Sequence, residues 1–149
     1  MKKINLKNLF EDDEYVKKSN MKFVKLDGDN LVLKMKPEKN QFNAYNILHG
    51  AEIFALMDTA AGCLSIINGK KAVTLDSSIN FISSISYGEE IYSNTKIIHM
   101  GKSTEVIEVV AMCKDKIIAR GSFTFFVVDE IEIIGKEFLE QWHNLIEKW

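Results

Sequence analysis

Cysteine, proline and surplus charge are all scarce in this chain, and two of these shortages each exclude a class of protein. The two cysteines, Cys63 and Cys113, lie inside apolar stretches. This placement argues against a disulfide framework or a cysteine metal site and indicates buried, reduced thiols. A formal net charge of -2 gives no electrostatic reason to expect nucleic-acid binding. The single proline, Pro37, marks the end of a predicted β-hairpin.

Long hydrophobic runs are also missing. The longest run, at 53–67, falls short of the about 20 residues that a membrane-spanning helix needs, and Asp58 interrupts it. The basic N-terminal residues carry no apolar core and no small-residue cleavage site, so we expect no signal peptide, no membrane partner and a cytoplasmic location. Hydrophobic residues make up 46% of the 149 residues and charged residues 27%, which is typical of one globular domain.

The hydrophobic pattern predicts an α+β domain. We expect helices at 5–18, 50–67 and about 136–149, and strands at 21–26, 31–35, 72–82, 90–100, 103–114 and 116–128. No linker or repeat divides the chain 1–149, and its core is expected at about 20–128. Short connections between the later strands favour antiparallel neighbours. Apolar residues occupy every side of the helix at 50–67, so we expect a curved antiparallel sheet to wrap this central helix.

Asp58 is the residue that this arrangement must explain. It lies in the middle of the apolar helix, where a carboxylate is costly unless it is paired, hydrogen-bonded or used in chemistry. The start of the same helix offers a different group. The N–H of Gly50 belongs to the first helical turn, where donors lack intrahelical acceptors and the helix dipole favours negative charge. A carboxylate and an oxyanion donor are both needed for acyl transfer.

Helix geometry keeps these two groups apart within one chain. Asp58 is nine residues after His49, which places it about 13 Å further along the axis and about 180° around it. They therefore cannot act on one carbonyl in the same chain. Two copies with antiparallel helices would bring His49 and Gly50 of one to Asp58 of the other, so the sequence predicts a shared site.

The motif residues resemble a known family. Three segments are similar to the hotdog-fold acyl-CoA thioesterases of the phenylacetate-degradation (PaaI) type: Asn43-Ala-Tyr-Asn-Ile-Leu-His49-Gly50, then Asp58, then Thr74-Leu-Asp-Ser-Ser-Ile-Asn80-Phe81-Ile-Ser-Ser. The likeness covers about residues 40–128. One position departs from the family pattern, because Ala51 stands where a second glycine is usual. The change leaves the Gly50 N–H in place, and we expect it to narrow the approach to the thioester.

The resemblance implies a role for each catalytic candidate. Asp58 acts as general base or as nucleophile, and these two routes stay open. Gly50 donates its N–H to the oxyanion. Asn43 orients the water or the thioester, His49 fixes Asn43 and its loop by hydrogen bonds, and Thr74 helps to hold the water near Asp58. Family members are homodimers, often dimers of dimers, with sites across the interface.

Substrate contacts are expected from loops and from the strand after the helix. The turn Gly-Lys102-Ser103 matches a family turn near the nucleotide of coenzyme A, and Lys70 and Lys71 are further candidates for its phosphates. Phe81 is a candidate wall of the acyl pocket. Other candidate wall residues, which make an aryl or medium-chain acyl group plausible, are Phe42, Tyr45, Leu56 and Ile82. No metal is expected, and no cofactor other than coenzyme A as part of the substrate.

Simpler interpretations compete with each role. Asp58 could cap the backbone or pair with a lysine, Asn43 could only form a turn, and Thr74 is an ordinary strand residue. Cys63 fits packing better than nucleophilic catalysis, because no base is close to it in the sequence. Two other functions stay open beside hydrolysis. One is a hotdog dehydratase acting on a thioester, and the other is a non-catalytic acyl-CoA-binding module.

Overall fold

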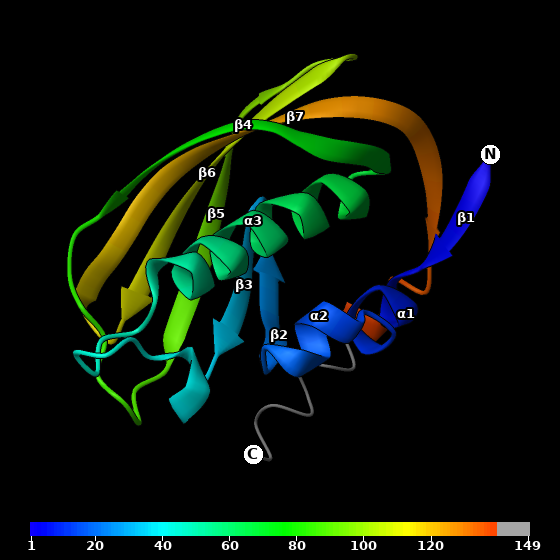
Figure 1. Cartoon of the computed structure of the whole chain (residues 1–149). Coiled ribbons are helices and arrows are strands. Elements are labelled where there is room, and N and C mark those ends of the chain that lie inside the picture. Colours follow the sequence, from blue (N-terminus) through cyan, green and yellow to red (C-terminus); the bar gives the residue numbers. More distant parts are fainter. Residues whose placement is uncertain (140–149) are drawn as a thin grey trace.

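The computed structural model describes residues 1–139 of the chain. Its elements follow one another along the chain and pack mainly against one side of a single long helix (Figure 1). In chain order they are β1 (Lys2–Asn5), α1 (Leu6–Glu11), α2 (Glu14–Lys18), β2 (Met21–Asp27), β3 (Asn30–Met35), the 3-10 helix η1 (Lys39–Gln41), α3 (Gly50–Ile67), β4 (Lys70–Phe81), β5 (Ile91–Met100), β6 (Thr104–Cys113) and β7 (Lys116–Ile134).

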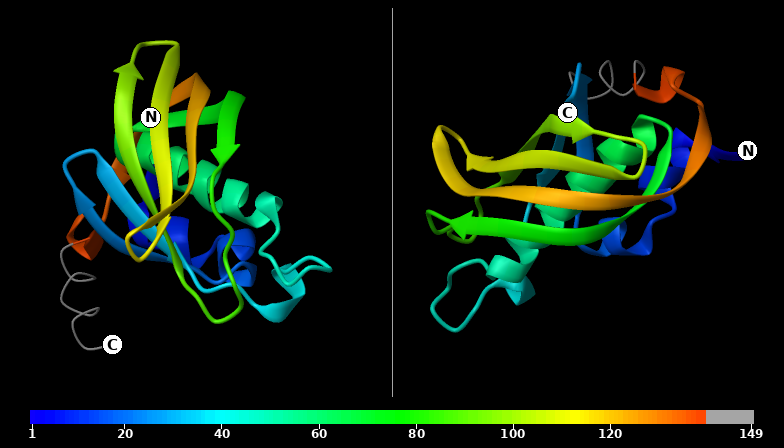
Figure 2. Two further views of the ribbon diagram at one scale, coloured as in Figure 1. Left: turned by 90° about the vertical axis from the view of Figure 1, so that its left-hand side faces the viewer. Right: turned by 90° about the horizontal axis from the view of Figure 1, so that it is seen from above.

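A curved, mainly antiparallel sheet wraps α3, as the hydrophobic pattern predicts. Its strand order is β1-β7-β6-β5-β3-β2, and β4 pairs with β7 as well. The hairpin β2–β3 and the strands β5, β6 and β7 are antiparallel neighbours joined by short turns. Figure 2 shows β4 at the border of the sheet, next to β7. This hotdog architecture confirms the predicted fold class.

Strand β4 pairs with β7 and not with β5, the strand that follows it in the sequence. Residues 82–90 separate β4 from β5, and β4 pairs with β7 from Lys70 opposite Glu130 to Phe81 opposite Ala119. Beyond this segment, β1 continues along β7 in parallel, with Lys2 opposite Ile131. Neither β1 nor the extension of β7 to residue 134 was predicted, because both depend on pairing between the two ends of the chain.

The central helix is covered on one side only. Leu56, Met57 and Ala60 are fully buried against the concave face of the sheet. The opposite side of α3, which carries Ala55, Asp58 and Gly62 among others, is only partly covered. The expectation of a helix buried all round is therefore wrong for a single copy, because one sheet shields one face of a helix. By length and composition alone α3 could cross a membrane, with 18 residues and a mean hydropathy of 1.5, but half of it is buried in this core.

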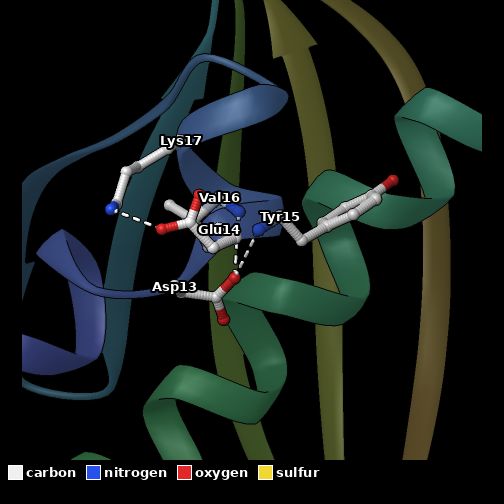
Figure 3. A network of polar contacts seen from close by, with 5 residues as sticks. All are labelled: Asp13, Glu14, Tyr15, Val16 and Lys17. Carbon is white, nitrogen blue, oxygen red and sulfur yellow. Dashed lines mark hydrogen bonds and ion pairs between the residues drawn. The ribbon is translucent and has the colours of Figure 1, made fainter.

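The predicted N-terminal helix at 5–18 is two short helices. Asn5 caps α1 by accepting a hydrogen bond from the Lys7 backbone N–H at 3.0 Å, as expected for a capping asparagine. The chain then breaks before Asp13, whose carboxylate accepts from the N–H groups of Tyr15 and Val16 at 2.9 and 3.0 Å (Figure 3). Asp13 is the N-cap of a new helix, and for this reason the segment forms two short helices in place of one.

The predicted C-terminal helix at about 136–149 lies outside the described residues from residue 140 onward. Just before that point, the ring of Phe138 stacks on Phe10 of α1 with a centroid distance of 6.4 Å. The Phe10 ring also packs against Phe23 of β2 at 5.4 Å. The end of the described chain therefore returns to the N-terminal helices.

Candidate active site

Asp58 and Thr74 form a direct pair. The Thr74 hydroxyl donates a hydrogen bond to Asp58 Oδ1 at 2.8 Å. Asp58 comes from the middle of α3, and Thr74 comes from the inward face of β4, opposite the buried Phe125 of β7. The pair lies on the partly covered side of α3, so the carboxylate meets both a hydroxyl donor and solvent. A carboxylate in this setting is ready to accept a proton.

Gly50 lies at the other end of the functional region. It is the first residue of α3, and its backbone N–H has no acceptor within residues 1–139. A pocket of about 380 Å³ opens beside it, with walls from the preceding loop, α3, and the residues at and after the end of β4. The pocket is lined by Asn43, Ile47, Leu48, Gly50, Ile53, Phe81, Ile82, Ser83 and Ser84. A hollow that combines apolar side chains with a free N–H suits an acyl carbonyl.

The ring of Phe81 lies directly against Gly50. A Cβ added to Gly50 would come within 3.2 Å of Phe81 Cζ, so a larger side chain at this position must displace the ring. The glycine therefore allows the aromatic wall to approach the helix start closely. Of the other predicted wall residues, Ile82 lines the pocket, whereas Leu56 lies in the core and Tyr45 is 84% exposed on the loop. Phe42 packs edge-on against Tyr87.

Asn43 organises the loop before α3. Its Oδ1 accepts from the backbone N–H groups of Tyr45 and Ile47 at 2.9 and 3.1 Å, which is the local turn bonding typical of asparagine. The predicted hydrogen bonds from the His49 side chain to this loop are not made between described residues. Instead, the His49 backbone N–H donates to the Gln41 carbonyl at 3.1 Å. His49 is exposed, and Asn43 is one of the residues that line the pocket.

Gln41 is a residue that sequence reasoning missed. Its side-chain nitrogen donates to Glu52 Oε2 at 2.7 Å, and its side-chain oxygen accepts from the Glu38 N–H at 2.7 Å. The bond to Glu52 ties the loop to the first turn of α3, although neither residue lines the pocket at Gly50. The capping-box spacing from Glu38 to Gln41 was the available signal.

The two halves of the predicted site do not meet in one chain. Gly50 and Asp58 are eight residues apart on one straight helix, which separates them by about 12 Å along its axis. Accordingly, the pocket at Gly50 includes neither Asp58 nor Thr74. A larger hollow of about 610 Å³, bordered by β2, β3, β5 and β6, contains none of the predicted site residues.

The candidate phosphate contacts divide into two kinds. Lys70 is largely buried: its ammonium lies 3.4 Å from Glu105 Oε1 and donates to the Gly101 carbonyl. Because these two contacts occupy the ammonium group, Lys70 has little capacity to bind a substrate phosphate. Lys71 at the start of β4, and Lys102 with Ser103 in the β5–β6 turn, are exposed. The Lys70 bond to Gly101 places that turn beside the start of β4, near the C-terminal end of α3.

Neither cysteine is arranged for catalysis. Burial raises the pKa of the Cys63 thiol to about 12, and the nearby carboxylates of Asp13 and Asp58 act in the same direction. Burial, followed by the Glu89 carboxylate, also raises the pKa of Cys113. Both thiols stay protonated near neutral pH and are therefore poor nucleophiles. Residues 1–139 contain no group of three histidine, cysteine or acidic side chains that could hold a metal ion.

Sequence comparisons relate this chain to thioesterases. The family model described as the thioesterase superfamily matches residues 45–119. A protein of Archaeoglobus fulgidus with the provisional name esterase is 30% identical over 125 residues, which cover 78% of this chain and 81% of that protein. Acyl-coenzyme A thioesterase PaaI of Escherichia coli is 25% identical, covering 70% and 75%. The transcription factor FapR of Staphylococcus haemolyticus is 24% identical, covering 64% of this chain and 50% of FapR.

Solved structures with a fold similar to this one include a thioesterase protein and PaaI. A hypothetical thioesterase protein of Streptococcus pneumoniae with coenzyme A superposes with a TM-score of 0.77 at 25% identity, covering 85% of this chain and 99% of that one. Escherichia coli PaaI superposes with a TM-score of 0.80 over 86% and 93% of the two chains, and at 22% identity this likeness concerns the fold. Two further structures of the Streptococcus pneumoniae protein carry alanine in place of an aspartate and of a threonine.

Proposed function

Because the chain belongs to the thioesterase superfamily, we propose that it hydrolyses an acyl-CoA thioester to the free acid and coenzyme A. Its relative PaaI is an acyl-coenzyme A thioesterase, and the Streptococcus pneumoniae neighbour was solved with coenzyme A. Both observations support coenzyme A as the leaving group. The acyl group is proposed to be an aryl or medium-chain one, because Ile53, Phe81 and Ile82 give the pocket at Gly50 apolar walls.

The observation that carries this proposal is the hydrogen bond from Thr74 to Asp58. The two residues are 16 positions apart. The aspartate and the threonine that were replaced in the neighbouring Streptococcus pneumoniae structures are also 16 positions apart. This equal spacing supports a shared functional pair of an acid on the central helix and a hydroxyl on the following strand.

The reaction uses these groups in a simple order. A water oxygen attacks the thioester carbonyl carbon, and Asp58 accepts the proton that the water loses. Thr74 holds the Asp58 carboxylate in place through its hydroxyl. The carbonyl oxygen gains negative charge, which the Gly50 N–H and the positive end of α3 stabilise. The carbon–sulfur bond then breaks, and the thiolate of coenzyme A takes up a proton. Direct attack by Asp58, with later hydrolysis of the anhydride, gives the same products.

The site needs two copies of the chain. Within residues 1–139, β4 pairs only with β7, so one edge of this 12-residue strand has free backbone groups. Such an edge is a template for a second copy. Antiparallel pairing of two β4 strands about a two-fold axis sets the α3 helices antiparallel, which directs Gly50 of one copy toward Asp58 of the other. The proposed assembly is a homodimer or a dimer of such dimers.

The same arrangement assigns the ends of the substrate. Asp58, Thr74 and the turn with Lys102 and Ser103 belong to one copy, while Gly50 and its pocket belong to the other. The thioester lies between them, with the acyl group in the pocket and the nucleotide toward Lys102. Lysine ammonium groups bind phosphates as point charges, and Lys71 is a second exposed candidate. Lys70 is left out of this role, because Glu105 and Gly101 already occupy its ammonium.

The proposal is tested by release of free thiol from a panel of aryl- and medium-chain acyl-CoAs. We expect thiol to appear with the purified protein, and the buried cysteines to contribute no background in the folded state. Hydration of an enoyl-CoA without thiol release would instead identify a dehydratase. Tight acyl-CoA binding without turnover would favour a binding module.

A further inference from the structure

Glu105 is a charged residue in an apolar position. The inward-facing residues of β6 are Glu105, Ile107, Val109, Ala111 and Cys113, and all are buried. Glu105 itself has no exposed surface. Burial of a carboxylate requires compensating partners, because the group loses its hydration. The partners of Glu105 therefore indicate what the residue does.

Those partners come from the two elements that carry the Asp58–Thr74 pair. Ser65 of α3 is 1% exposed, and its hydroxyl donates a hydrogen bond to Glu105 Oε2. Lys70, the first residue of β4, places its ammonium 3.4 Å from Glu105 Oε1. The same ammonium donates to the Gly101 carbonyl in the turn before β6. Glu105 thus joins the end of α3 to the beginning of β4.

The spacing of these contacts matches that of the catalytic pair. Ser65 follows Asp58 by seven residues, so the two lie two helical turns apart and about 20° from each other around α3. Lys70 precedes Thr74 by four residues, and an even separation places both side chains on the same face of β4. Two bridges therefore connect the same side of α3 with the same face of β4: one through Glu105, and one from Thr74 to Asp58.

We propose that Glu105 is a positioning residue, which holds α3 against β4 through Ser65 and Lys70 so that the Thr74 hydroxyl reaches Asp58. This inference rests on the proposed function. Stability alone is a poor reason for such a network, since well-packed apolar residues often replace a buried ion pair without loss. The hydrogen bonds from Ser65 to Glu105 and from Lys70 to the Gly101 carbonyl are directional, whereas apolar contacts tolerate sliding; the contact of Lys70 with Glu105 Oε1 is an ion pair without a hydrogen bond. The network fixes the register between helix and strand, on which a 2.8 Å contact depends.

The test replaces both charges with apolar residues of similar size, in the variant Glu105→Leu/Lys70→Met. We expect kcat for the best acyl-CoA to fall about tenfold with KM within about twofold, as for a misplaced catalytic pair. Glu108→Gln is the control, because Glu108 lies on the same strand but faces outward toward Arg120. Unchanged kcat in a folded double variant would overturn the proposal. If that variant does not fold, Ser65→Ala removes one bridge and is measured in the same way.

A second background separates positioning from general damage. In Thr74→Val the contact with Asp58 is already lost, so we expect the Glu105→Leu/Lys70→Met change to cause no further loss of kcat. An equal loss in both backgrounds would show a role independent of Thr74. A crystal structure of the double variant gives a readout that needs no activity. The Thr74–Asp58 separation is expected to exceed hydrogen-bond range, and an intact bond would refute the inference even if the proposed function failed.

Discussion

The first turn of α3 and the middle of the same helix offer different halves of one reaction. At Gly50 there is a free N–H and a pocket with apolar walls, but the residues that line this pocket include no carboxylate and no imidazole. At Asp58 there is a carboxylate held by Thr74, but the Gly50 pocket does not extend to it. Each region is incomplete by itself. This difference is the reason for our proposal that a complete site comes from two copies, each providing the half that the other lacks.

The largest expected effect is at the carboxylate. Asp58→Asn removes the proton acceptor but keeps the size of the side chain and a partner for Thr74. We expect kcat to fall by at least ~100-fold, in the range of a lost general base. Thiol release with saturating acyl-CoA measures it. Asp76→Asn is a matched control, because a β-bulge after Thr74 sets Asp76 opposite Thr124 and so on the outward face of β4. Full activity in Asp58→Asn would refute the mechanism.

The next effect is at the helix start. Gly50→Val keeps the N–H but puts branched carbon atoms where the Phe81 ring now lies, so we expect about a 100-fold loss of kcat/KM, comparable to the loss of an oxyanion donor. Gly50→Ala is the graded comparison, because one Cβ at 3.2 Å requires only a small shift of the ring. Equal rates for Gly50→Val and the unaltered protein would show that the carbonyl binds elsewhere.

A smaller effect is expected at the hydroxyl. Thr74→Val keeps the shape but removes the hydrogen bond to Asp58, and bonds to charged groups are worth about 1.5–3 kcal/mol. We expect at least about a tenfold decrease in kcat by the same assay. Thr74→Ser retains the hydroxyl and should stay within about threefold. If Thr74→Ser and Thr74→Val lost activity equally, strand packing rather than the hydrogen bond would be responsible.

The smallest effect is expected at Cys63, which lies on α3 between Asp58 and Ser65. Because its thiol has a pKa of about 12, it carries almost no thiolate at pH 7–8. Cys63→Ala should leave kcat unchanged while lowering the free energy of unfolding by roughly 1–2 kcal/mol, through lost packing. Activity assays and thermal unfolding measure the two effects. A large fall in kcat without loss of stability would revive a cysteine mechanism.

Local sequence signals predicted the central helix and the first hairpin well. The bounds of α3 followed from the apolar run and from Asn68-Gly69, where Gly69 has a φ of +83° that suits a helix end. The Asp27–Asn30 turn predicted the β2–β3 hairpin. The pairing of β1 and β4 with β7 could not be predicted in this way, because it joins segments that are distant in sequence.

The candidate site was predictable as a set of residues but not as a set of contacts. The helix spacing already separated Gly50 from Asp58, and the structure adds the hydrogen bond between Thr74 and Asp58. The environment of Lys70 was missed, because a lysine beside a glycine resembles an exposed loop residue. Period-two alternation along β6 could have revealed Glu105, which shares the inward face with Ile107 and Val109.

The shared site is tested most directly by combining two inactive chains. Chains with Asp58→Asn and with Gly50→Val are given different tags, co-expressed, and purified as the mixed dimer. If each site takes Gly50 from one copy and Asp58 from the other, one of the two sites in the mixed dimer is intact and the other carries both changes. We then expect about half of the unaltered dimer's kcat, because two-fold symmetry gives two equal sites. A mixed dimer no more active than either parent variant would contradict the account.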